Sequence, residues 1–158
     1  MMRFALLLVL FSGFAAVSAA DPQLAFDFTL IDKPGKNPLL VAWIEDDKGK
    51  FVRTLHVFGK AQKHFKDLAT WWRKRGSTEP QKALDAVVGP TITWKQHVAL
   101  KVPASDIRVG YVLRIEQGQE AKPDFHADKL TIPLTANWKG TDLKANVFFE
   151  QLSIKLEP

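Results

Sequence analysis

Two adjacent tryptophans inside a basic segment are the strongest candidate for a binding surface in this 158-residue sequence. Trp71 and Trp72 stand between Lys66 and the basic stretch 73–75. Neighbouring side chains of a helix point about 100° apart, so one indole ring can enter a core while the other reaches the helix flank. An exposed indole among cations can stack on a flat ligand, dock a partner protein or touch an anionic membrane surface. The competing interpretation is that both rings cover the open end of the fold.

Histidines are the only soft-to-borderline metal ligands in the chain, because it contains no cysteine. The four histidines are spread along the sequence without the spacing of a ligand motif: His56, His64, His97 and His126. A site for iron or copper would require the fold to bring His56 and His64 together with carboxylates such as Asp67 or Glu116. The alternative is that these are ordinary surface or half-buried histidines.

Sequence signatures of catalysis are missing. The serines at positions 77, 105 and 153 lie outside any Gly-x-Ser-x-Gly turn, and the nine glycines form no phosphate loop or dinucleotide fingerprint. The acids Asp46, Asp47 and Glu116 suit acid/base chemistry, but a charged hairpin turn and a strand-end acid explain them equally well. We therefore predict a protein that is not an enzyme, and no cofactor can be named from these residues.

The elements that would position these side chains are mostly strands. The spacing of Phe65, Leu68 and Trp72 predicts one helix over about 63–75, with Lys66 and Arg75 turned outward. The segment 84–90 is either a turn or a helix fragment. Strands are predicted where β-forming residues run between turn signals: 24–31, 39–45, 51–58, 91–94, 97–102, 110–116, 129–134 and 146–156. This order predicts a mainly β fold, an antiparallel immunoglobulin-like β-sandwich with one inserted helix.

The strand predicted over 51–58, which forms a hairpin with 39–45, is expected to be covered on both sides. One face of this strand carries Phe51, Arg53, Leu55 and Val57, and the other carries Val52, Thr54, His56 and Phe58. Neither face is purely polar, which indicates burial on both. Trp43 and Trp94 are predicted to be core residues on strands.

The first twenty residues predict the compartment. Arg3 precedes an apolar run over 4–11, and small residues lead to Ala19 and Ala20, as in a cleavable signal peptide. We expect residues 1–20 to be removed and 21–158 to form one exported domain. The absence of cysteine favours a bacterial periplasm. Since the Lys and Arg residues behind the net charge of +5 are scattered, nucleic-acid binding is not expected.

The middle of the chain resembles a family of predicted periplasmic proteins, domain-of-unknown-function family 2271. Order and spacing agree over about residues 39–91, and a weaker match continues through 110–116. The matching pieces are Val41-Ala42-Trp43-Ile44-Glu45-Asp46, Gly49-Lys50-Phe51-Val52-Arg53-Thr54-Leu55, Val57-Phe58-Gly59, Phe65-Lys66-Asp67-Leu68, Trp71-Trp72, and Leu84-Asp85-Ala86-Val87 with Gly89. The chain has Val88-Gly89-Pro90-Thr91 where the family has a Thr-Gly-Ala-Thr-like stretch, and it lacks the Trp-Asp-Gly turn expected soon afterwards.

The resemblance implies a periplasmic β-sandwich and supplies no catalytic residues. It also implies companions, namely membrane reductases of the PepSY type and flavin transferases, in iron or siderophore uptake. We therefore predict a periplasmic accessory or binding protein whose contacts are Arg53, Lys66, Trp71 and Trp72. Hydrogen bonds from Arg53 and stacking by Trp72 suit an anionic aromatic ligand such as a flavin or a siderophore complex. The alternative is a periplasmic metal-handling protein that uses His56 and His64.

Overall fold

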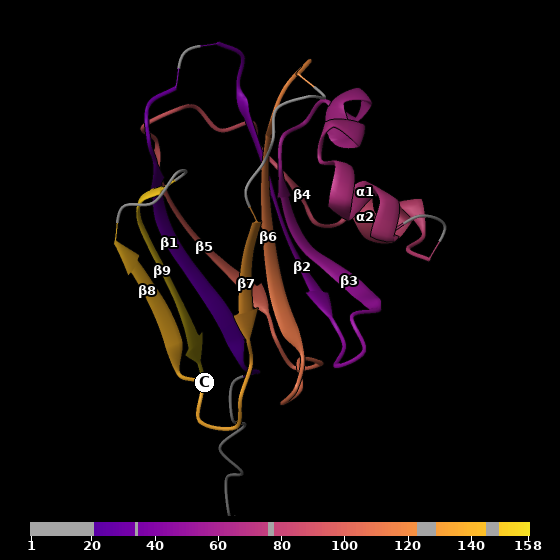
Figure 1. The fold of residues 1–158 in the computed structure, drawn as a ribbon, viewed down its shortest axis with the longest axis vertical. Coiled ribbons are helices and arrows are strands. Elements are labelled where there is room, and N and C mark those ends of the chain that lie inside the picture. Colours follow the sequence, from indigo (N-terminus) through magenta and orange to yellow (C-terminus); the bar gives the residue numbers. More distant parts are fainter. Residues whose placement is uncertain (1–20, 34, 76–77, 123–128, 145–148) are drawn as a thin grey trace, which may run out of the picture.

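Two β-sheets lie face to face, and a group of short helices covers the outer side of one of them (Figure 1). The computed structural model describes residues 21–33, 35–75, 78–122, 129–144 and 149–158. The predicted signal peptide over 1–20, His126 and the predicted start of the last strand at 146–148 lie outside the described residues. The prediction of a mainly β, two-sheet sandwich is confirmed.

The strands belong to a four-stranded and a five-stranded sheet. The first has the order β5 (His97–Pro103), β1 (Gln23–Leu30), β9 (Phe149–Glu157) and β8 (Gly140–Lys144). The second has the order β4 (Val88–Gly89), β3 (Phe51–Phe58), β2 (Pro38–Glu45), β6 (Val112–Gln119) and β7 (Lys129–Pro133). All strand pairs are antiparallel except β3 with β4, which is parallel. The predicted hairpin of 39–45 with 51–58 is β2 with β3.

The space between the sheets holds the main core. Alternate residues of β1 point into it, because side chains of a strand alternate between its two faces. At its centre the ring of Phe28 makes edge contacts with Phe58 and Phe149, at centroid distances of 5.4 and 5.5 Å. Packing between the two inner faces therefore holds the sandwich together.

A second core lies on the outer face of the five-stranded sheet. There a 3₁₀-helix, η1 (Gln62–Asp67), and two α-helices, α1 (Ala69–Arg75) and α2 (Gln81–Asp85), cover the sheet (Figure 1). Every residue of β2 is buried as a result. The expected coverage of both faces of the strand 51–58, β3, is confirmed, because β3 contributes to the main core and to this second cluster. The second cluster comprises Leu39, Val41, Trp43, Phe51, Val57, Phe65, Leu68, Trp71 and Leu84.

The predicted alternation along β3 is wrong. The pairing of β2 with β3 shifts between Ala42 and Trp43, and Leu55 is the extra residue of this bulge. A bulge sends the residues on its two sides out of phase. A second shift, between Ile44 and Glu45, makes Val52 another extra residue. With both bulges, Leu55 faces the core between the sheets, whereas Phe51 and Val57 face the helices.

The predicted continuous helix over 63–75 is also wrong in its details. The chain forms η1, breaks at Leu68 with φ −89° and ψ 69°, and then forms α1. This break changes the helical phase, so Trp71 rather than Trp72 joins Phe65 in the core. Arg75, predicted to turn outward, is buried for the same reason.

The structure also differs from the sequence pattern at two smaller points. Residues 91–94 form no strand, and Trp94 is only half-buried, with its Nε1 donating to the carbonyl oxygen of Lys36. The pattern predicts no strand at β8, which begins at Gly140, the last residue of the predicted turn 137–140. The segment 84–90, left open between a turn and a helix fragment, contains the end of α2 and the two residues of β4.

Candidate functional site

Helix α1 presents its two tryptophans in opposite environments. Trp71 is fully buried, its ring 5.7 Å from that of Phe65, and its Nε1 donates to Thr54 Oγ1 at 2.9 Å. Trp72 is 40% exposed. The second interpretation, in which both rings cover an open end of the sandwich, does not fit, because α1 lies over the outer sheet face. Trp72 is therefore the indole that can reach a ligand.

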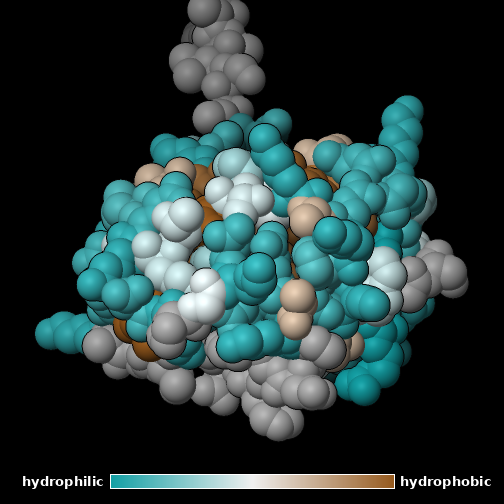
Figure 2. All heavy atoms as spheres, turned by 90° about the horizontal axis from the view of Figure 1, so that it is seen from above, coloured by the Kyte–Doolittle hydropathy of each residue, from teal (hydrophilic) through white to brown (hydrophobic). Residues whose placement is uncertain are grey.

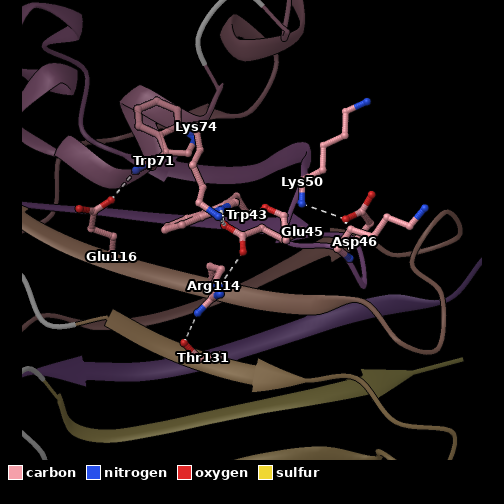
Figure 3. Close-up of polar contacts among 11 residues, drawn as sticks. Trp43, Glu45, Asp46, Lys50, Trp71, Lys74, Arg114, Glu116 and Thr131 are labelled. Carbon is pink, nitrogen blue, oxygen red and sulfur yellow. Dashed lines mark hydrogen bonds and ion pairs between the residues drawn. The ribbon is translucent and has the colours of Figure 1, made fainter.

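A buried carboxylate holds the start of α1. Glu116 on β6 accepts hydrogen bonds from the backbone N–H groups of Thr70 and Trp71, at 3.0 and 2.7 Å. The first turn of α1 contains no acidic residue of its own. The first N–H groups of a helix lack partners within it. Glu116, on the sheet, supplies the acceptor for two of these N–H groups, and Figure 3 shows its bond to Trp71.

A second buried carboxylate ties the end of α1 to the sheet. Glu45, at the end of β2, accepts from Lys74 Nζ at 2.6 Å, Arg114 Nε at 2.9 Å and Trp43 Nε1 at 3.1 Å (Figure 3). Arg114 also donates to the hydroxyl of Thr131. Burial acts to raise the pKa of Glu45, but the bonds from Lys74, Trp43 and Arg114 outweigh it and the pKa is lowered. Glu45 therefore keeps its charge and fixes the height of α1 above the sheet.

A third acid lies on the other side of the tryptophans. Glu79 accepts from the backbone N–H and the hydroxyl of Thr54, at 2.8 and 2.6 Å. Arg75 lies 3.5 Å from the same carboxylate, and its guanidinium is 5.1 Å from the ring centre of Trp72 and 5.7 Å from that of Trp71. This cation–π geometry limits the positions that Trp72 can take. The exposed indole is thus supported from beneath.

The structure does not bring the predicted contact residues together as one group. Lys66 is exposed on η1, on the same helical cover as Trp72. Arg53 makes a bidentate pair with Asp106, at 2.6 and 2.7 Å, and donates to the carbonyl oxygen of Pro103. Neighbouring Thr54 faces α1, so Arg53 points to the opposite side of β3. The hydrogen bonds from Arg53 lower the pKa of Asp106, and this effect is larger than that of burial, which raises it.

The two candidate metal ligands occupy separate places. His64 Nδ1 lies 3.2 Å from Asp67 Oδ2, the carboxylate named in the metal hypothesis, and Asp67 also accepts from the N–H of Ala121 at 3.1 Å. His56 packs edge-on against Phe58, with a centroid distance of 4.5 Å. Glu116 is occupied by α1 and does not join either histidine. Within the described part of the chain, no three His, Asp or Glu side chains are grouped so that they could hold a metal ion.

Below neutral pH, protonation of His56 is expected to destabilise the protein. Burial lowers the pKa of His56 to about 4, from 6.5 for a free imidazole. Between these values the unfolded chain binds the proton and the folded chain does not, so stability is complete above about pH 6.5 and falls as pH decreases towards 4. Allowing for the solvent that still reaches the ring, we expect a loss of about 2 kcal/mol. Urea unfolding of the wild type and of His56→Gln, at pH 7 and at pH 4.5, measures this loss. The free energy of unfolding should fall less between the two pH values in the variant than in the wild type. Equal losses would contradict the lowered pKa of His56.

Sequence reasoning missed the residues that position α1. The sequence pattern places Glu45 within the hairpin run and gives no role to Arg114 or Glu79. A signal was available, because Glu45 and Glu116 both stand within runs of strand-forming residues, where an unpaired acid is costly. An acid at such a position indicates partners from another element. Here those partners are the cations and the backbone N–H groups of α1 and a neighbouring strand.

Comparison with known proteins places the chain in a family. A family model described as "Predicted periplasmic protein (DUF2271)" matches residues 23–150, which include Trp43, Glu45, Trp71, Trp72 and Glu116. No curated protein and no solved structure matches the chain significantly. No helix in the described ranges has the length and apolar character to cross a membrane. Because the family model covers most of the sequence, the chain belongs to the DUF2271 family of predicted periplasmic proteins.

Proposed function

We propose that this protein is a non-enzymatic periplasmic binding module whose contact surface is the exposed side of η1 and α1, with Trp72 at its centre. The observation that carries the proposal is the 40% exposure of Trp72 beside a fully buried neighbour. Tryptophan is enriched among the residues that dominate binding at interfaces, so an exposed indole on a well-anchored helix is a candidate contact residue. Export through cleavage of residues 1–20, leaving 21–158 as one domain, is part of the proposal.

The charges around Trp72 favour a flat anionic ligand or an anionic partner surface. Lys66 and Arg73 are exposed on the same helical cover, and the guanidinium of Arg75 lies beneath the indole. Aromatic rings stack on indole, and nearby cations attract the negative charge of phosphate or carboxylate groups. A flavin or a siderophore complex combines these two properties. Service to a PepSY-type membrane reductase or a flavin transferase system, in iron uptake, agrees with that chemistry and comes from the family resemblance.

The anchoring of α1 supports recognition by a preformed surface. Glu45, Glu79 and Glu116 connect α1 and the chain after it to three strands of the sheet, β2, β3 and β6. A rigid surface loses little conformational entropy when it binds. The histidines do not support metal handling to the same extent, because His56 and His64 occupy separate environments.

Binding of flavin mononucleotide to Trp72→Ala tests the proposal. We expect at least tenfold weaker binding than in the wild type, because the stacking platform is lost. Titration calorimetry measures it, and tryptophan fluorescence of the unfolded and folded forms confirms that the variant folds. Lys66→Gln should weaken binding less, with an effect that shrinks as salt increases.

The matched control is Leu156→Ala. Leu156 is 41% exposed, close to the value for Trp72, but lies at the end of β9 away from α1. Flavin binding should be unchanged in this variant. Equal affinity in the wild type and Trp72→Ala would refute the α1 surface, and no detectable binding in either protein would refute the flavin form of the proposal.

A further inference from the structure

A pocket of about 210 Å³ opens at the end of the sandwich where β1 begins and β9 ends, the lower end in Figure 1. Its walls come from β1, β9, the connection between β5 and β6, and the connection between β7 and β8. Most of the wall is apolar, with Leu24 and Leu134 buried at the core side and Trp138 half-buried. The indole Nε1 of Trp138 already donates to Thr141 Oγ1 at 2.9 Å, so the ring contributes an apolar surface.

The rim of this pocket exposes apolar side chains to water. Among the described residues four large apolar side chains are exposed, and two of them line this pocket: Val109 at 69% and Leu156 at 41%. The opposite end of the molecule, seen from above, is mostly hydrophilic with small separate apolar spots (Figure 2). A concentration of exposed apolar side chains around a hollow is typical of a binding site.

The charges at the rim are all positive. Arg108 and Lys139 line the pocket, both are exposed, and neither forms an ion pair with any residue that the structure describes. No Asp or Glu is found among the described residues of its lining. Three acids flank lining residues in the sequence: Asp21, Asp106 and Glu157. Asp106 is held by Arg53 and Glu157 by Lys101, each at 2.6 Å. Two free cations beside an apolar hollow match a molecule with an apolar body and one anionic head.

We propose that this pocket binds a medium-chain fatty carboxylate. The alkyl chain lies against Leu24, Leu134 and Trp138, and the carboxylate faces Arg108 and Lys139. The volume is below the range of about 300 to 1,000 Å³ typical of drug-sized ligands, which favours a medium chain over a long-chain lipid. Guanidinium suits a carboxylate because it offers two parallel N–H donors. This site is separate from α1 and does not depend on the proposed function of Trp72.

Calorimetric titration of the chain 21–158, which contains every described element, tests the proposal with octanoate as the probe. Octanoate should bind, whereas 1-octanol should bind more weakly and octyltrimethylammonium should not bind. The double variant Arg108→Gln/Lys139→Gln should weaken octanoate binding at least tenfold and leave 1-octanol binding unchanged. The matched control Lys66→Gln/Arg73→Gln removes two exposed cations from the helical cover and should leave octanoate affinity unchanged.

A blocking variant locates the site. Ala136 is exposed and lines the pocket, so Ala136→Trp should fill its mouth, abolish octanoate binding and leave the fold intact. In the wild type, octanoate should also shift the indole N–H resonance of Trp138. The proposal is overturned by the absence of octanoate binding at millimolar concentration, by equal binding of all three octyl probes, or by full affinity in Ala136→Trp. Loss of affinity in the Lys66/Arg73 control would assign the effect to overall charge and overturn it too.

Discussion

Replacing Trp71 with alanine should lower the free energy of unfolding by about 4 kcal/mol, the middle of the range for a buried aromatic residue. The side chain is fully buried beside Phe65, and its Nε1 donates to Thr54 Oγ1. Truncation removes the apolar contacts, leaves a cavity beneath α1 and deletes this hydrogen bond. Urea unfolding followed by far-UV circular dichroism measures the loss.

The adjacent Trp72 supplies the matched control. Trp72→Ala removes the same side chain from the next residue, but 40% of that side chain is already exposed. Its cost should stay at about 1 kcal/mol or less, mainly from the lost contact with Arg75. Similar losses in the two variants would contradict the placement of Trp71 inside and Trp72 outside the second core.

The sequence predicts the strands well where hydrophobic alternation is regular. Residues 24–31, 39–45 and 51–58 correspond closely to β1, β2 and β3, because each run ends at a Gly or Pro turn signal. Alternation assumes an unbroken ladder, however. The bulge at Leu55 is set by the pairing with β2, so it has no local signal and the two faces of β3 were assigned incorrectly.

Dependence on tertiary contacts also explains why the sequence pattern selects the wrong buried tryptophan in the helical segment. Helical periodicity over 63–75 selects Trp72 with Phe65 and Leu68, whereas the break at Leu68 selects Trp71. The break lies against β6: a Cβ at Gly118 would approach the Leu68 side chain to 3.2 Å and the Asp67 carbonyl oxygen to 3.3 Å. The backbone of η1 therefore packs against the sheet at a glycine, which local periodicity cannot reveal.

The candidate site likewise has features that the local sequence indicates and features that depend on contacts between distant elements. Residue type and neighbouring charge single out the Trp71-Trp72 pair, but the sequence leaves open which indole is exposed, and helical spacing places Trp72 with Phe65 and Leu68. The structure exposes Trp72. Arg53 was grouped with it because both carry suitable chemistry, but strand pairing sends Arg53 to Asp106 on the other side of β3. The supporting acids Glu45 and Glu79 acquire their roles only through contacts between elements distant in sequence.

Glu116→Gln should cost about 3 kcal/mol, because it removes a buried charge that accepts two backbone N–H groups. Glutamine has the same shape, but only one of its two terminal atoms can accept. One of the N–H groups of Thr70 and Trp71 would then face an amide N–H₂ instead of an oxygen. Equilibrium unfolding measures the cost, and amide hydrogen exchange should accelerate first at Thr70 and Trp71.

The matched control for Glu116 is Glu150→Gln on β9. Glu150 is exposed, so the same change in charge should alter stability by no more than about 0.5 kcal/mol. A small effect at both positions would mean that α1 does not depend on the acid beneath it. A large effect at Glu116 alone, with exchange accelerated in α1 before β2 or β6, would show that one carboxylate of the sheet holds the helix. Since Trp72 is carried by that helix, the same variant should also weaken flavin binding, which links the buried acid to the proposed surface.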